Sequence, residues 1–175
     1  MEYFRLITSN CMKEPIRAEG LDTGYYKPNI TREEFANIPK AMVSYYDYKA
    51  ELEFPDYIAS PVPLFSTKLR NVLQIYDEEI LYKPIRFFAN QPEVKKSLLY
   101  WFLYLRQLDC LHETCEKNPN GSIREVILDR HKIMGQDIFR IQGILENKVI
   151  VSLPAAESIL RRKLYGIGFE KVKVI

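Results

Sequence analysis

The clearest pattern of apolar and polar positions lies near the end of the chain. Residues 138–142 and 149–152 are short runs rich in β-branched and aromatic side chains, a composition that is typical of β-strands. Gly143 and Asn147 lie between the two runs and favour a turn. The pattern therefore predicts a β-hairpin.

A helix is predicted to begin directly after this hairpin. The Ser152 hydroxyl is placed to accept a hydrogen bond from a free N–H group of the first turn, and Pro154 fits that turn because it has no N–H to satisfy. Gly166 is expected to follow the helix as a residue with positive φ. Residues 169–174 are expected to form a closing strand at a sheet edge, where lysines discourage pairing with other chains. The apolar stripe of the helix is expected to comprise Leu153, Ala156, Ile159, Leu160 and Leu164.

Two further helices and several strands are predicted upstream. Thr31 and Glu34 have the spacing of a capping box, and Ser66 has the position of an N-cap before an apolar stripe. Residues 98–108 also fit a helical spacing, but their aromatic content favours a strand that is buried on both faces. The other strands are expected at residues 3–8, 41–54 (with an irregular exit), 80–88 and 123–128.

Length and charge limit the class of protein. A chain of 175 residues is expected to form one domain with a substantial core. The predicted fold class is α+β: a single domain spanning residues 1–175, with a largely antiparallel sheet of about six strands and a few packed helices. The formal net charge of +2 provides no strong field, so neither a nucleic acid nor an anionic membrane is favoured as a partner.

The location of the protein is predicted from its cysteines and its N-terminus. Three cysteines are few and odd in number, which fits a reducing compartment better than a disulfide framework. The first residues lack the basic and apolar regions of a signal peptide. The longest strongly apolar run, residues 98–105, is shorter than the roughly 20 residues that a membrane span needs. A cytoplasmic location is therefore expected.

Cysteine and histidine provide the nearest approach to a reactive site. Cys110, His112 and Cys115 have ligand types that suit zinc, but a fourth ligand with recognisable spacing is missing. Cys110 or Cys115 paired with His112 or His131 would make a nucleophile and a base if the fold brought them together. Phosphate-loop, serine-elbow and zinc-protease motifs are absent from the sequence. Neither a catalytic residue nor a metal or other cofactor is expected.

Charged runs give two weaker indications. Two groups of acidic residues carry carboxylates of the kind used in acid–base or metal chemistry, although such runs are more often solvated. They are residues 77–79, and Glu51, Glu53 and Asp56. A basic C-terminal group provides a possible contact for RNA or an acidic protein. This group comprises Arg161, Arg162, Lys163, Lys171 and Lys173.

Tyrosine-rich stretches are the best candidates for a contact surface. Tyrosine supplies a large contact area at a small entropic cost, and it is common at protein interfaces. The candidate partner-binding residues are Tyr25, Tyr26, Tyr45, Tyr46, Asp47 and Tyr48.

The chain also resembles a known family over roughly residues 55–174. The matching stretches are Asp56-Tyr57, Pro63-Leu64-Phe65-Ser66, Leu99-Tyr100-Trp101, Leu108-Asp109-Cys110-Leu111, Ile127-Leu128-Asp129, Asp137-Ile138-Phe139-Arg140-Ile141, Val149-Ile150-Val151-Ser152 and Leu164-Tyr165-Gly166-Ile167-Gly168-Phe169. In these stretches the chain is similar to immunity proteins of bacterial polymorphic toxin systems. Residues 10–50 do not match clearly, so they form either a variable recognition surface or a lineage-specific insertion.

The resemblance implies a function without catalysis. Proteins of this class neutralise a cognate toxin, normally made by the same cell and encoded nearby, by binding it. They are often acidic, whereas this chain is slightly basic, which does not fit mimicry of a nucleic acid. Two alternatives remain open from the sequence: a small enzyme that uses a cysteine and a histidine, and an RNA-binding module. The oligomeric state is also open.

Overall fold

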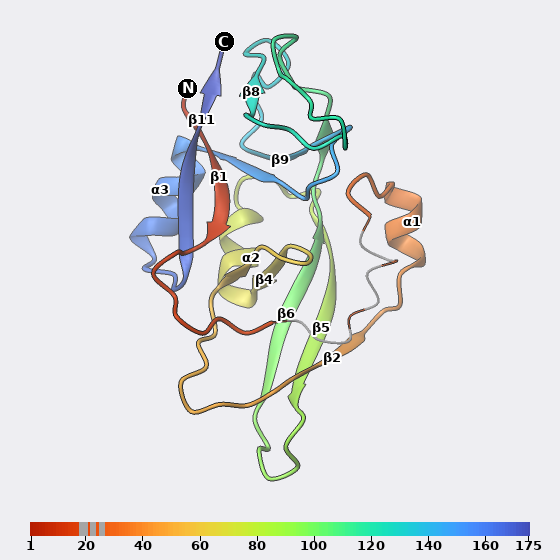
Figure 1. The fold of residues 1–175 in the computed structure, drawn as a ribbon, viewed down its shortest axis with the longest axis vertical. Helices are drawn as coiled ribbons and strands as arrows, with labels where there is room; N and C mark the ends of the chain where they lie inside the picture. The colour runs from red at the N-terminus through yellow and green to blue at the C-terminus, as the bar shows by residue number, and fades with distance from the viewer. Residues whose placement is uncertain (18–20, 22–23, 25–26) are drawn as a thin grey trace.

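The structure of the protein is a computed structural model that describes residues 1–17, 21, 24 and 27–175 (Figure 1). These residues contain three helices and eleven strands, which form two mixed sheets of six and five strands. The expected α+β class is therefore confirmed. The strands are divided between two sheets, where one sheet of about six strands was expected.

The six-stranded sheet brings together the two ends of the chain. In order across the sheet, the strands are β7 (Gln107–Leu108), β9 (Ile138–Ile141), β10 (Val149–Ser152), β1 (Tyr3–Thr8), β11 (Ile167–Val174) and β8 (Ile127–Leu128). β1 pairs antiparallel with β10 and β11, and β10 pairs antiparallel with β9. The short strands β7 and β8 pair in parallel at the two edges. The predicted hairpin is the β9–β10 pair, which is confirmed.

The five-stranded sheet is built on the long β5–β6 hairpin. The turn of this hairpin lies at the end of the molecule opposite both termini (Figure 1). β2 joins β5 in parallel, and β4 joins β6 antiparallel. In order across the sheet, the strands are β2 (Met42–Tyr46), β5 (Leu81–Ala89), β6 (Ser97–Tyr104), β4 (Leu64–Ser66) and β3 (Tyr57–Ile58).

The chain passes from one sheet to the other directly after Tyr104. The predicted strand at 98–108 is a strand rather than a helix, but it is split in two. β6 ends at Tyr104, and Gln107 and Leu108 pair with Arg140 and Ile141 in the other sheet. Leu105, between the two strands, is buried in the core cluster that the sheets share.

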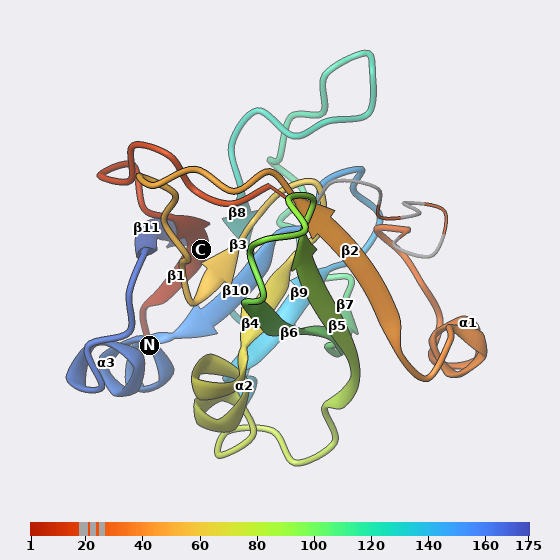
Figure 2. The ribbon, with the colours of Figure 1, turned by 90° about the horizontal axis from the view of Figure 1, so that it is seen from below.

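The three helices begin where the sequence predicts. Thr31 forms a complete capping box with Glu34, and Ser66 and Ser152 each accept a hydrogen bond from the third residue of the following helix. α2 and α3 pack side by side, whereas α1 lies apart from them beyond β2 (Figure 2). The helices are α1 (Arg32–Asn37), α2 (Thr67–Leu73) and α3 (Leu153–Arg161).

Three details of the C-terminal unit differ from the prediction. α3 ends at Arg161, and the left-handed residue after it is Lys163 (φ 51°). Gly166 does have positive φ, but it lies in the turn before β11, where a Cβ atom would be 2.5 Å from the Cβ of Pro55. Leu160 is 61% exposed, so it is not part of the buried stripe.

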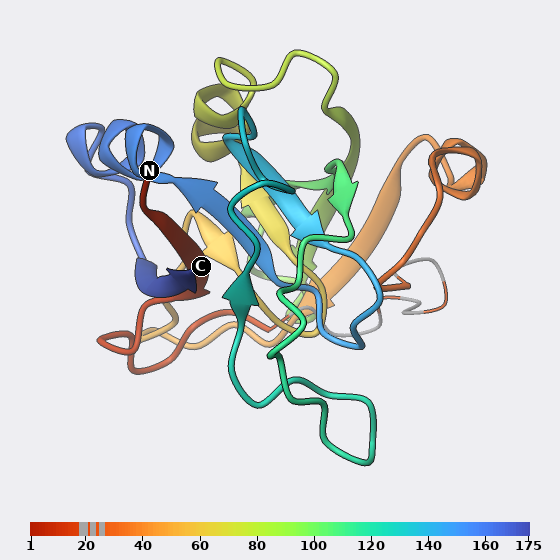
Figure 3. The ribbon, with the colours of Figure 1, turned by 90° about the horizontal axis from the view of Figure 1, so that it is seen from above.

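Two predicted strands also differ. Of the segment 123–128, only β8 forms a strand. The connection from β7 to β8 instead projects from the body, on the side opposite α2 and α3 (Figure 3). β11 was expected at a sheet edge, but it lies between β1 and β8. It pairs with β1 over most of its length, whereas its pairing with β8 among the described residues is limited to Lys173 and Val174.

Among the described residues, the longest helix is α3, with nine residues. None of the helices in this part of the chain has the length and apolar character that crossing a membrane requires.

Candidate functional site

The structure separates the predicted tyrosines. Tyr45 is 50% exposed, whereas its neighbour Tyr46 is 1% exposed. Successive side chains of a strand point to opposite faces of a sheet, so Tyr46 packs edge-on against Phe54 at 5.9 Å, and its hydroxyl donates to the Lys96 carbonyl. Tyr46, one of the predicted contact residues, therefore lies in the core and not on the surface. Tyr25 and Tyr26 lie outside the described residues.

Asp47 and Tyr48 fix the exit of β2 to the turn of the β5–β6 hairpin. The Asp47 carboxylate accepts a hydrogen bond of 2.7 Å from the Asn90 amide, and the Tyr48 backbone N–H donates to the Gln91 side chain at 2.9 Å. Both residues remain exposed. Tyr45, Asp47 and Tyr48 thus lie together on the surface at one end of the sheet.

Tyr45 belongs to a larger exposed surface on the five-stranded sheet. In the register of β2 and β5, Val43 is paired with Arg86 and Tyr45 with Phe88. The next pairs, between β5 and β6, extend the same face, because directly paired residues point to the same side. We call this surface the aromatic face; it comprises Val43, Tyr45, Tyr82, Arg86, Phe88, Leu99 and Trp101.

The aromatic face is exposed because only part of this side of the sheet is covered. Phe65 of β4 and Leu103 of β6 are buried with Leu69 of α2 in the core cluster between the sheets. The opposite side of the sheet is buried near α1, where Phe35 packs against Phe102 with ring centroids 5.3 Å apart. Farther from α2, the apolar side chains of the face are partly exposed to solvent: Val43 and Tyr45 are each 50% exposed, and Phe88 is 39% exposed. Tyr82, next to α2, is 43% exposed.

Two arginines give the aromatic face a positive charge. The guanidinium carbon of Arg70, from α2, lies 4.0 Å from the ring centroid of Trp101 and 4.6 Å from that of Tyr82, distances typical of cation–π interactions. Trp101 is held in place because its indole N–H donates to the Thr67 hydroxyl at 2.9 Å. Arg86 donates to the Ser97 hydroxyl at 3.1 Å. None of the residues that define the face is acidic.

The sequence pattern alone does not distinguish most of these residues as surface residues. Tyr82, Phe88 and Trp101 are aromatic residues in strands, and such residues are usually buried. The signal that could have found them is the spacing within β5, where Tyr82, Arg86 and Phe88 share one side. That signal becomes informative only when the partner strands are known.

No side-chain hydrogen bond joins a cysteine to a histidine among the described residues. Cys110 is fully buried, and burial raises the pKa of its thiol to about 12. The Cys115 sulfur lies 3.2 Å from both the backbone N and O of Ile127, and His112 Nδ1 lies 2.8 Å from the Thr114 hydroxyl. His131 is exposed. Among residues 1–17, 21, 24 and 27–175, no group of three or more His, Cys, Asp or Glu side chains is placed to hold a metal ion.

Two of the predicted carboxylates, Glu53 and Asp56, have structural partners. Glu53 accepts hydrogen bonds from the backbone N–H groups of Lys13 (2.7 Å) and Glu14 (3.2 Å) and from the Tyr165 hydroxyl. These bonds lower the pKa of Glu53, the Tyr165 bond most strongly. Asp56 accepts from the Tyr165 backbone N–H at 2.7 Å. Glu53 and Asp56 therefore join the N-terminal segment and the turn before β11 to the region of β3.

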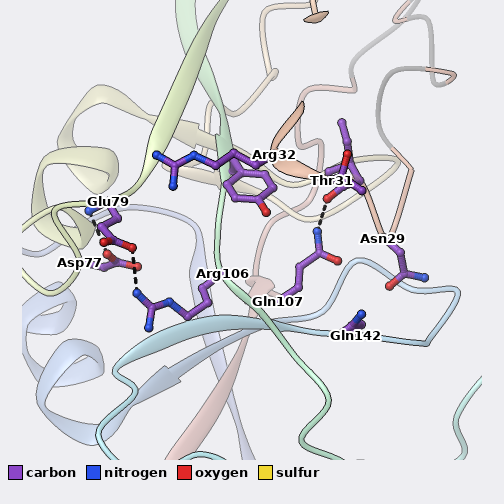
Figure 4. A pocket seen from close by; sticks show the side chains of 10 residues that line it. Asn29, Thr31, Arg32, Asp77, Glu79, Arg106, Gln107 and Gln142 are labelled. Atoms are coloured by element: carbon purple, nitrogen blue, oxygen red, sulfur yellow. Dashed lines mark hydrogen bonds and ion pairs between the residues drawn. The ribbon is translucent and has the colours of Figure 1, made fainter. Parts of the chain in front are cut away.

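A polar pocket of about 400 Å³ lies between the start of α1 and the end of β6 (Figure 4). Two of its charged groups are paired, because Arg106 makes an ion pair of 2.9 Å with Glu79. The Asp77 carboxylate accepts a hydrogen bond from the Glu79 backbone N–H. The Gln107 amide donates to the Ile30 carbonyl. The described residues that line it include no histidine, cysteine or serine. The Thr31 hydroxyl accepts a hydrogen bond in the capping box of α1.

The basic C-terminal residues are exposed but partly paired. Arg161 lies 3.0 Å from Glu157, one turn earlier in α3, and Lys171 makes an ion pair with Glu2. Arg162 donates to the Ser158 carbonyl at 2.9 Å. These partners reduce the positive charge that this group presents to an RNA.

No protein-family model matches the sequence, and no curated protein matches it.

Proposed function

We propose that this chain is an immunity-type protein that binds and neutralises a cognate toxin in the cytoplasm of the cell that makes both. The toxin is a protein encoded nearby, and neither a nucleic acid, a membrane nor a cofactor takes part in its recognition. The observation that carries the proposal is the aromatic face, with its exposed Tyr45, Tyr82 and Phe88. The family resemblance over residues 55–174 supports it.

The composition of the aromatic face suits protein recognition. Tyrosine, tryptophan and arginine are the residue types most enriched among those that dominate binding energies at interfaces. Contiguous exposed apolar residues of this kind commonly mark interaction sites. The side chains stand on paired strands rather than on a loop, so little ordering entropy is lost when they are covered.

The charge of the aromatic face specifies the partner further. Arg70 and Arg86 provide the positive charge at the face, and the defining residues contribute no carboxylate. The exposed Asp47 lies near Tyr45, just after β2, where its carboxylate accepts a hydrogen bond from Asn90. A partner surface with an apolar centre and acidic residues around it would be complementary. Such complementarity raises the association rate and excludes wrong partners more than it raises affinity.

The proposal is tested by a pull-down of the tagged protein against the product of the adjacent gene, followed by calorimetry. A stoichiometric complex with a nanomolar Kd, equivalent to about 12 kcal/mol, is expected. Tyr45→Ala and Phe88→Ala are each expected to weaken it by about 1–3 kcal/mol. Leu160→Ala, which removes an exposed apolar side chain from α3, is the matched control and is expected to leave the Kd unchanged.

The aromatic face favours one competing function. Exposed aromatic rings on a sheet, flanked by arginines, also suit the stacking of single-stranded RNA bases. Such binding would weaken steeply as salt is raised, because phosphate contacts release counterions. Failure to bind or protect against any neighbouring-gene product, together with salt-dependent binding of an RNA oligonucleotide that Tyr45→Ala abolishes, would replace the immunity proposal with this one.

A further inference from the structure

A second cleft opens where two strands of the six-stranded sheet separate. β1 and β10 pair from Tyr3–Ser152 to Arg5–Ile150. Beyond that pair, β1 and the β9–β10 connection leave an opening of about 430 Å³, with Tyr57 of the other sheet among its lining residues. The polar residues that line it are Arg5, Tyr57, Ser60, Glu146, Asn147 and Lys148.

Two cationic side chains line this cleft. The Arg5 guanidinium uses one terminal nitrogen in an ion pair of 2.5 Å with Glu170, but its Nε is buried and has no hydrogen-bond partner among the described residues. The Lys148 side chain is only 11% exposed, and its ammonium lies 3.5 Å from Glu146 Oε1. Both groups therefore retain donors that the protein does not use.

A third cation lies directly behind the cleft. Arg140 of β9 is 3% exposed, and its Nη2 donates to the Pro28 carbonyl and to the side-chain oxygen of Asn147, which itself lines the cleft. The Nε of Arg140 has no hydrogen-bond partner among the described residues, and its guanidinium group makes no ion pair with any of them. Burial lowers the pKa of Arg140 to about 10, so the group is still charged at neutral pH.

The three cations outnumber the anions beside them. Arg5, Lys148 and Arg140 carry three positive charges, whereas Glu170 and Glu146 carry two negative ones. A buried guanidinium that lacks a counter-ion is strongly disfavoured. An anion bound in the cleft would supply the missing charge. Phosphate and carboxylate groups have the oxygen acceptors that guanidinium and ammonium donors require.

Glu146 adds a condition on the anion. Its Oε2 is buried and has no hydrogen-bond partner within the part of the chain that the structure describes, while its Oε1 faces Lys148 and the Ile123 backbone N–H (3.4 Å). A ligand that offers only acceptors would meet this carboxylate with repulsion. A ligand that also carries a hydroxyl donor would satisfy it.

We propose that this cleft binds a small oxyanion that carries a proton, of which inorganic phosphate is the simplest. Arg5 and Lys148 hold the anionic oxygens, Arg140 and Asn147 support them from behind, and the Glu146 carboxylate accepts the P–OH hydrogen bond. Sulfate has a similar size and shape but carries no proton at neutral pH, so the same carboxylate rejects it. The site shares no residue with the aromatic face and does not depend on the immunity proposal.

The test compares inorganic phosphate with sulfate at pH 7 and constant ionic strength. Phosphate about tenfold above its Kd is expected to raise the Tm of the full chain by roughly 3–6 °C, whereas sulfate is expected to match a chloride reference. Calorimetry should give one phosphate per chain. Equal Tm values in phosphate, sulfate and chloride, with no heat of binding, would overturn the proposal.

Two variants test the roles of the side chains. Lys148→Met is expected to weaken phosphate binding about tenfold or more, and Glu146→Gln is expected to let sulfate bind nearly as well as phosphate. Lys171→Met, which changes an exposed lysine of β11, is the control and is expected to leave both affinities unchanged. Each cleft variant replaces a side chain that lines the cleft with one of similar length, and the far-ultraviolet circular dichroism of both should match that of the parent. Phosphate affinity that is unchanged in a folded Lys148→Met protein would contradict the proposed site.

Discussion

The guanidinium group of Arg70 lies over the indole ring of Trp101, 4.0 Å from its centroid, and also contacts the ring of Tyr82. The two aromatic rings meet edge to face, with centroids 5.2 Å apart. This stack connects α2 to the aromatic face of the five-stranded sheet. It therefore holds a positive charge in a fixed position beside the surface to which we assign partner binding.

Arg70→Ala is expected to destabilise the protein modestly. The cation–π contacts of a partly exposed arginine contribute about 0.5–1 kcal/mol, so the free energy of unfolding in urea should fall by about that amount. Arg161→Ala provides the control, because Arg161 makes an exposed i,i+4 ion pair with Glu157, worth about 0.3–0.5 kcal/mol. A loss for Arg70→Ala no larger than that of the control would show that the stack contributes little.

Tyr45 and Tyr46 are expected to respond differently to truncation. Tyr46→Ala removes a fully buried ring and should lower the free energy of unfolding by about 3–5 kcal/mol, since large aromatic side chains leave a cavity. Tyr45→Ala should change it by less than about 0.5 kcal/mol, because the side chain is half exposed. Urea denaturation of the two variants measures both values. Equal losses would contradict the assignment of the two side chains to opposite faces.

Cys110 is expected to resist alkylation at neutral pH. Burial raises the pKa of its thiol to about 12, so the reactive thiolate is scarce, and the sulfur is shielded from reagent. Iodoacetamide labelling followed by mass spectrometry should modify the exposed Cys11 first and Cys110 only after unfolding. Rapid labelling of Cys110 in the native protein would revive the interpretation as a cysteine-dependent enzyme.

Glu53 is expected to make stability depend on acid pH. Its hydrogen bonds lower the pKa of the folded carboxyl below the ordinary value of 4.5. The contribution is therefore fully present above that value. It declines as the pH falls, because the unfolded chain takes up a proton first, and it is lost once the folded carboxyl is also protonated. Chemical denaturation at a series of pH values should show a shallower acid slope for Glu53→Gln than for the parent. Identical slopes would exclude this role.

Ser152→Ala is expected to destabilise α3. The Ser152 hydroxyl accepts from the Ala155 backbone N–H and donates to Asp137, so the substitution removes an N-cap worth about 1 kcal/mol. It also leaves a part-buried carboxylate without its donor, which adds about 1–3 kcal/mol. Ser152→Thr retains a hydroxyl and should recover most of the loss. Thermal unfolding of the two variants distinguishes them, and equal Tm values would contradict the capping role.

Local features of this protein are determined by its sequence. Thr31, Ser66 and Ser152 begin the three helices as predicted, because capping depends on a few consecutive residues whose side chains reach their own backbone. The β9–β10 hairpin is equally local, since its turn residues and β-branched runs are adjacent in the chain. The strand character of residues 97–104 also follows from local aromatic content.

The tertiary structure decides which of these elements meet. The division into two sheets depends on the pairing of Gln107 and Leu108 with β9, a strand about thirty residues away, and no local pattern specifies that choice. The same holds for the aromatic face, which exists because β2 joins β5 in a register that places Tyr45 beside Phe88. It holds also for the cleft, where Arg5 and Lys148 are brought together from opposite ends of the chain. Burial and charge at these places are sums over distant segments, so only the folded chain determines them.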